Sequence, residues 1–164
     1  MIKVAKTQQG KVGLVGLIEI TVRDRFGVVK EKRNIKNLIV NAGLAGLASR
    51  INGSGSEAAF TYLEVGIGTT AAAPTQTALI TPITDTGLAR AAATCSRVQT
   101  TVANDTAKLS KTWTGFSVSK AITEVGAFND PTAGTMLGRQ TFSAVNVQSG
   151  DSLQVDYSFV SANA

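Results

Sequence analysis

The stretch Ser152-Leu153-Gln154-Val155-Asp156-Tyr157-Ser158-Phe159-Val160 alternates polar and apolar side chains almost without interruption. Successive side chains of a β-strand point to opposite faces, so this period of two places the large apolar residues from Leu153 to Phe159 on one face. Antiparallel sheets with one packed face and one solvated face have this pattern. We therefore predict a half-buried strand over residues 152–160 and extend the fold assignment outward from it.

Several strand-like runs precede this stretch, and residues typical of turns separate them. Asn104-Asp105, Asn129-Asp130-Pro131 and Ser149-Gly150-Asp151 all carry side chains that cap a reversing backbone. Consecutive hairpins predict a mainly β protein, folded as an antiparallel β-sandwich or barrel. The predicted strands are Phe60 to Ile67, Leu88 to Val102, Ala107 to Val118, Ala121 to Phe128 and Thr135 to Phe142.

The N-terminal part of the chain predicts a β-hairpin arm. Apolar residues and one glycine recur at every second position from Leu14 to Val22, which indicates a strand over Val12 to Arg23. Asp24-Arg25-Phe26-Gly27 has an acid at the first turn position and Gly at the last, so a second strand is expected from Val28 to Lys36.

One short helix is expected after this hairpin. Leu44, Leu47, Ala48 and Ile51 share the helical spacing of three and four, and Asn41 stands where an N-cap would be. Two glycines inside this segment weaken the helix but let its backbone lie close to a sheet.

The charge is unevenly distributed between two expected segments. The chain has 164 residues and a net charge of +5, yet the part up to Asn37 holds nine Lys or Arg against three acids. We therefore divide the chain into a basic N-terminal arm or hairpin, residues 1–37, and a β-sandwich body, residues 38–164. A negatively charged partner for the arm and a plain solvated β-ribbon are equally compatible with this pattern. The candidate partner-contact residues are Lys3, Lys6, Lys11, Arg23, Arg25, Lys30, Lys32, Arg33 and Lys36.

The composition argues against enzyme chemistry. The chain contains no His, which removes the commonest general base and metal ligand, and its one cysteine, Cys95, is expected to be a small core residue. The acids are scattered, so no catalytic, metal-binding or cofactor-binding residues are assigned and no cofactor is expected. Gly66-Ile67-Gly68-Thr69-Thr70 lacks the third glycine and the lysine of a phosphate-binding loop, and is interpreted as an ordinary loop.

Other classes of partner are also disfavoured. No stretch approaches the roughly 20 continuous apolar residues of a membrane span, and no export signal is visible, so the protein is expected to be soluble and made in the cytoplasm. Phe26 is the only ring among the N-terminal basic residues, which makes direct nucleic-acid binding an unfavoured interpretation. Trp113 is expected to be buried, with sugar stacking as the alternative. Glu124 alternates onto an otherwise apolar strand face and needs a buried partner, for which Arg139 is the candidate.

Several strings in the body resemble a family of small virion proteins of tailed phages. They are Asn41 to Ala45, Tyr62 to Thr70, Thr77 to Leu79, Ile122 to Asn129, Gly134 to Arg139 and Gly150 to Val155, so the resemblance covers roughly residues 37–159. Members of this family are described as decoration, tail-fibre-like or minor structural proteins. The resemblance implies a virion component without catalytic residues, in which Glu124 and Arg139 form a structural pair between adjacent strands.

The expected function is therefore structural. The first hypothesis is a capsid decoration or cement protein, a homotrimer whose basic hairpin bridges subunits of the major capsid protein in the virion. The alternative is a tail fibre, collar or baseplate accessory subunit. A glycan-acting enzyme is a third hypothesis, which depends on Trp113 being free to stack on sugar.

Overall fold

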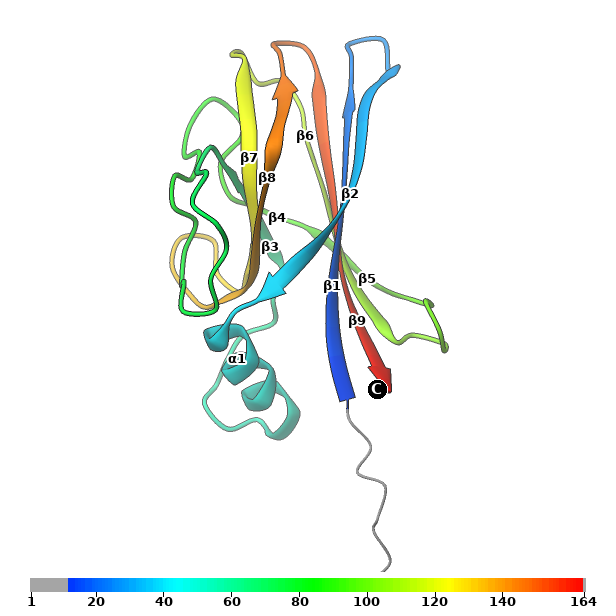
Figure 1. Cartoon of the computed structure of the whole chain (residues 1–164), viewed down its shortest axis with the longest axis vertical. Coiled ribbons are helices and arrows are strands. Elements are labelled where there is room, and N and C mark those ends of the chain that lie inside the picture. The colour runs from blue at the N-terminus through cyan, green and yellow to red at the C-terminus, as the bar shows by residue number, and fades with distance from the viewer. Residues whose placement is uncertain (1–11, 164) are drawn as a thin grey trace, which may run out of the picture.

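The structure is a computed structural model that describes residues 12–163 (Figure 1). It contains nine strands and one helix in that part of the chain. The elements are β1 (Val12–Arg23), β2 (Val29–Ile39), α1 (Asn41–Asn52), β3 (Tyr62–Gly66), β4 (Ala91–Ala92), β5 (Thr94–Val98), β6 (Thr106–Trp113), β7 (Lys120–Phe128), β8 (Met136–Val147) and β9 (Ser152–Asn163).

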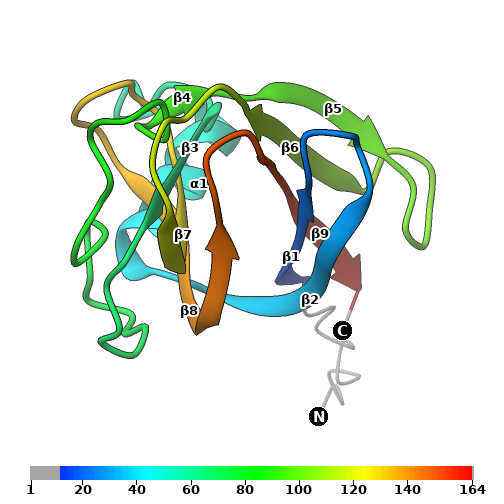
Figure 2. The same ribbon diagram turned by 90° about the horizontal axis from the view of Figure 1, so that it is seen from above.

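All nine strands belong to one antiparallel sheet that curls into a nearly closed barrel (Figure 2). Their order is β4-β3-β7-β8-β2-β1-β9-β6-β5, so the two edge strands are β4 and β5. These two follow each other in the chain and are separated only by Ala93, where the backbone turns from one end of the sheet to the other. The expectation of a mainly β protein with an antiparallel sandwich or barrel and one short helix is confirmed.

The main core lies inside the curled sheet. In β9, Leu153, Val155, Tyr157 and Phe159 are buried while the residues between them are partly exposed, as the alternating sequence predicts. Strand β1 pairs with β9 from Val12↔Asn163 to Arg23↔Ser152 and contributes buried side chains to the same core. The N-terminal hairpin is thus built into the barrel and shares its core with the rest of the chain.

A second, smaller core lies on the outer face of the β3-β7-β8 part of the sheet. Val40, Leu79, Phe128 and Met136 pack together there. The segment between β3 and β4 supplies most of the cover, together with Ala42 at the start of α1, while the rest of the helix lies below the lower end of the sheet (Figure 1). We call this segment, residues 67–90, the strap; it has no helix and no named strand, and only Pro82 forms an isolated bridge, with Gly66.

Helix α1 packs mainly by its glycines, and of the expected apolar face only Leu47 packs against the main core. Gly43 and Gly46 are its buried residues, whereas Leu44 is 52% exposed and Ile51 is 87% exposed. The N-cap is Val40 rather than Asn41, and no side chain caps the helix start. The helix lies so close to β8 that only a residue without a side chain fits between them, and this close approach decides which face is buried.

Gly43 should therefore tolerate no side chain. A Cβ atom at this position would lie 2.2 Å from the backbone oxygen of Leu137. We expect Gly43→Ala to destabilise the fold by about 1–3 kcal/mol, although Ala is the better helix former. Gly13→Ala is the control, because no atom of another described residue lies within 4 Å of a Cβ built there, and urea denaturation of both variants checks the difference. Equal stability of the two variants would contradict the close helix packing.

Three strand boundaries and one cysteine differ from expectation. The run Leu88 to Val102 is broken at Ala93, because the chain turns a corner there, and regular structure starts only at Ala91. Strand β6 ends at Trp113, and β8 continues beyond Phe142 to Val147. Cys95 is exposed rather than buried, since it lies on the edge strand β5. Within residues 12–163, no helix is long and apolar enough to cross a bilayer.

Candidate functional site

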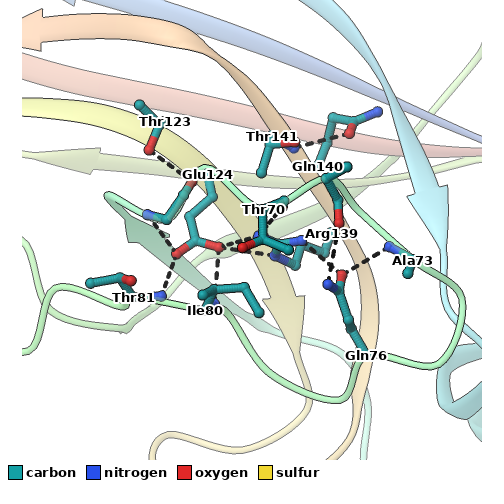
Figure 3. A network of polar contacts seen from close by, with 12 residues as sticks. Thr70, Ala73, Gln76, Ile80, Thr81, Thr123, Glu124, Arg139, Gln140 and Thr141 are labelled. Atoms are coloured by element: carbon teal, nitrogen blue, oxygen red, sulfur yellow. Dashed lines mark hydrogen bonds and ion pairs between the residues drawn. The ribbon is translucent and has the colours of Figure 1, made fainter.

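A fully buried ion pair joins β7 and β8. The Nη2 and Nε atoms of Arg139 donate to Oε2 of Glu124 at 2.7 and 2.9 Å, and both side chains are fully buried (Figure 3). The pair that the sequence suggested is thus present. Its place on the strap-covered face explains why an acid alternates with apolar residues along β7.

The same carboxylate binds the backbone of the strap. Its Oε1 atom accepts hydrogen bonds from the N–H groups of Gly68 at 3.0 Å and Thr81 at 2.7 Å, while Oε2 accepts one from Ile80 at 3.1 Å. Glu124 therefore joins two strap positions that are a dozen or so residues apart in sequence. We call Glu124, Arg139 and the strap groups that they bind the latch (Figure 3).

Arg139 completes the latch from the other side. Its Nη2 atom also donates to the carbonyl of Thr70 at 3.0 Å, and its Nη1 atom donates to the side-chain oxygen of Gln76 at 2.7 Å. Gln76 in turn donates to the carbonyl of Ala71 and accepts from the N–H of Ala73. Charge-assisted bonds of this kind are stronger than neutral ones, so the latch holds the strap firmly on the sheet.

Two glycines make this close approach possible. A Cβ atom at Gly66 would lie 2.5 Å from both Glu124 Oε1 and the Thr81 oxygen, and one at Gly68 would lie 2.5 Å from the same carboxylate oxygen. The glycine-rich loop that superficially suggested a phosphate site thus binds an anion that the protein itself supplies. Its interpretation as a loop without a phosphate-binding helix agrees with the structure.

A second ion pair fastens the other end of the strap. Arg90 Nη2 donates to Glu64 Oε2 on β3 at 2.9 Å, and its Nη1 binds the carbonyls of Asp130 and Ala133. The guanidinium also stacks on the Phe128 ring at 3.7 Å from the ring centre, an arrangement that favours the cation. Both ends of a long irregular segment are therefore held by buried or nearly buried arginines.

The latch is expected to make the fold less stable at acid pH. Burial alone would raise the pKa of Glu124, but the N–H groups of Thr81 and Ile80 and the Arg139 guanidinium outweigh it, so the pKa lies below the usual carboxyl value. The Glu124 carboxylate therefore stabilises the fold fully above the pKa that it has in the unfolded protein. This stabilisation is lost as the pH falls through its lower pKa in the folded protein. The pKa values of Asp105 and Asp130 are also lowered, mainly by backbone N–H groups of Val102 and Ala133, so they add to the same loss.

Comparing the wild type with Glu124→Gln isolates the latch. We expect the difference in unfolding free energy between the two proteins to shrink as the pH drops below the ordinary carboxyl range. Denaturant titrations at a series of pH values measure this difference. A difference that stays constant down to the acid unfolding of the wild type would contradict the assignment.

The latch is suited to holding structure rather than to chemistry. Both carboxylate oxygens accept bonds from fixed protein donors, so neither is placed to take a proton from a substrate. Trp113 is also engaged internally: it is 3% exposed, and its Nε1 donates to the Ala89 carbonyl at 2.9 Å. Its expected burial is confirmed, and sugar stacking on this ring is thereby ruled out in this structure.

Three of the predicted basic contact residues form salt bridges with acids of the chain itself. Lys30 pairs with Asp151 at 2.6 Å and Lys32 with Glu19 at 3.0 Å. Arg33 pairs with Glu31 and also donates to the Ala144 carbonyl at 3.1 Å and to the Ser143 side chain, both on β8. Strands β2 and β8 are paired only at Leu38↔Arg139 and Ile39↔Gly138, so Arg33 closes the barrel wall where the backbones diverge.

The other predicted contact residues differ in their surroundings. Arg23 donates to the Gly27 carbonyl within the hairpin turn, Arg25 stacks on Phe26, and Lys36 is exposed. None of these three forms a salt bridge with another described residue. Lys3, Lys6 and Lys11 lie outside the described residues.

The tip of the β1-β2 hairpin presents an aromatic ring on a well-defined turn. The Asp24 carboxylate accepts the N–H groups of Phe26 and Val28, each at 2.9 Å, and Gly27 adopts φ +82°. Phe26 is 76% exposed, and Val28 and Val29 beside it are also exposed. The tip therefore combines apolar side chains with Arg23 and Arg25. The sequence showed the turn and the charges but gave no sign that Phe26 faces solvent.

No family model, curated protein or solved structure matches this chain. Among residues 12–163, no cluster of three or more acids or cysteines could hold a metal ion.

Proposed function

We propose that the protein is a non-enzymatic structural component of a tailed-phage virion, and specifically a capsid decoration protein. The observation that supports this best is the hairpin tip, where exposed Phe26, Val28 and Val29 stand beside Arg23 and Arg25. Protein interfaces are enriched in aromatic side chains and Arg, and their binding energy comes mostly from a few such anchors. The resemblance of the body strings to virion proteins points to the same class.

The latch supports a mechanical role. A segment as long as the strap costs conformational entropy to order, and two ion pairs hold it against the sheet. A strongly cross-braced body with an anchor at one end is suited to bridging neighbouring subunits under load. In this proposal the bodies assemble as a trimer, and each hairpin contacts the major capsid protein across a seam between subunits.

Retention on capsid shells tests the proposal. Purified protein is mixed with shells that lack decoration and the mixture is sedimented. We expect the wild type to sediment with the shells, and we expect Arg25→Glu with Phe26→Ala to weaken binding about tenfold or more, because two anchors are lost. Ile51→Ala is the control, since Ile51 is also a largely exposed apolar residue but lies on α1. Failure of the wild type to bind shells would overturn the proposal.

The alternative is an accessory subunit of the tail, a fibre, collar or baseplate component. Copy number separates the two functions, because shell symmetry multiplies a decoration protein far beyond a tail part. Quantitative mass spectrometry of purified particles is expected to find the chain at a number comparable to that of capsid subunits. A copy number comparable to that of tail subunits would favour the alternative.

A further inference from the structure

Strand β2 has one long edge that no other described strand covers. It pairs with β1 from Gly16↔Asn37 to Arg23↔Val29. On its other side it pairs with β8 only at Leu38 and Ile39. Within the described chain, the edge over residues 31–36 is therefore free of backbone pairing, as the divergence of β2 from β8 in Figure 1 shows. Only side chains bridge it to β8: Arg33 donates to Ser143 and Ala144, and Gln140 donates to the Lys36 carbonyl, so an added strand displaces these contacts.

The backbone groups on this free edge can be identified. The Lys36 carbonyl accepts a bond from the side chain of Gln140 on β8 at 2.7 Å, so the backbone of Lys36 faces away from β1. Alternate residues of an antiparallel strand direct their N–H and C=O groups to the same edge. Lys32 and Asn34 consequently face the free edge too. A bulge near Lys30 changes the alternation beyond Glu31.

Two of the three side chains at these positions, Lys32 and Lys36, carry positive charge. Lys32 and Lys36 lie on the outer face, and β2 as a whole holds four cations against the single acid Glu31. The partner acid of Lys32 is Glu19 on β1, which lies on the side away from the edge. A second copy of β2 would bring lysines against lysines, and like charges directly opposite each other destabilise strand pairs. An acidic strand would place opposite charges there instead.

We propose that residues 31–36 of β2 bind an extended acidic segment of a partner protein, which adds a strand to the sheet at this edge. The inference rests on the proposed function, because it specifies how the basic hairpin meets a negative partner. Backbone hydrogen bonds from Lys32 and Asn34 give the affinity, and the two lysines select acids at alternate positions. The exposed Val28 and Val29 at the hairpin end offer contact to an apolar residue at the end of the segment.

A pair of substitutions at Asn34 tests strand addition separately from charge attraction. Asn34→Pro removes the N–H that faces the free edge and leaves the bonds to β1 in place, and Pro is tolerated on edge strands. Asn34→Ala is the matched control. The probe is a short capped peptide in which Glu alternates with Thr, used at low salt and compared with the same peptide carrying Gln in place of Glu. Circular dichroism verifies that both variants keep the wild-type fold.

The wild type and Asn34→Ala are expected to bind the acidic peptide equally, and Asn34→Pro about tenfold or more weakly. The Gln peptide and an N-methylated acidic peptide are expected to bind at least tenfold more weakly than the parent peptide. Equal binding by Asn34→Pro and Asn34→Ala, or no binding of the acidic peptide, would overturn the inference. Sedimentation with capsid shells is measured independently. If shells retain Asn34→Pro as well as the wild type, only the edge inference is contradicted. If shells do not retain the wild type, only the decoration function is contradicted.

Discussion

Replacing Arg139 with Met is expected to lower the free energy of unfolding by about 3–5 kcal/mol, because it leaves the Glu124 carboxylate buried without its counter-charge. Met retains much of the length and apolar stem of Arg, so the change removes charge and hydrogen bonds more than volume. The bonds from Arg139 to Thr70 and Gln76 disappear at the same time, which loosens the first half of the strap. Equilibrium denaturation in urea measures the loss, with an unchanged slope indicating an unchanged native fold.

Arg97→Met is the control for this substitution, since Arg97 is exposed and forms no salt bridge with another described residue. It is expected to change stability by less than about 0.5 kcal/mol. Adding Glu124→Gln to Arg139→Met removes both charges and is expected to restore part of the loss, because no buried charge then remains unpaired. A loss below about 1 kcal/mol for Arg139→Met alone would show that the latch contributes little.

Trp113→Ala is expected to destabilise the protein by about 3–5 kcal/mol through loss of buried apolar surface and formation of a cavity. The indole lies in the main core, opposite Leu153 of β9, and its N–H satisfies the Ala89 carbonyl at the end of the strap. The substitution therefore removes packing and leaves one carbonyl without its donor. Thermal unfolding followed by circular dichroism measures the effect without requiring the lost fluorophore.

Phe26→Ala is the matched aromatic control. Its ring is mostly exposed on the hairpin tip, so little apolar area becomes accessible on truncation, and the expected change is within about 0.5 kcal/mol. The two substitutions should therefore have different effects: Trp113→Ala lowers the stability of the fold, and Phe26→Ala weakens only binding to shells. Similar stability losses for both would indicate that the tip packs against the body in solution.

Only part of the candidate site could be predicted from the sequence. Glu124 and Arg139 were paired correctly because an acid among apolar neighbours on a strand needs a buried cation nearby. The strap groups that complete the latch were not foreseen, since the N–H groups of Gly68, Ile80 and Thr81 have no sequence signature. The basic residues of the hairpin were identified, but only the structure separated Lys30 and Arg33, which brace the barrel, from Lys36, which is exposed and forms no ion pair with another described residue.

The sequence by itself determined most of the strands, the hairpin turn at Asp24 to Gly27 and the mainly β class, because alternation and turn chemistry are properties of neighbouring residues. The tertiary structure alone decided that the β3-β7-β8 face is covered by the strap and that β2 leaves β8 after two residue pairs. It also decided that α1 packs by its glycines. The physical reason is the same for these three features. Segments that are distant in sequence compete for the same surface, and close approach, charge pairing and chain connectivity decide which segment packs there.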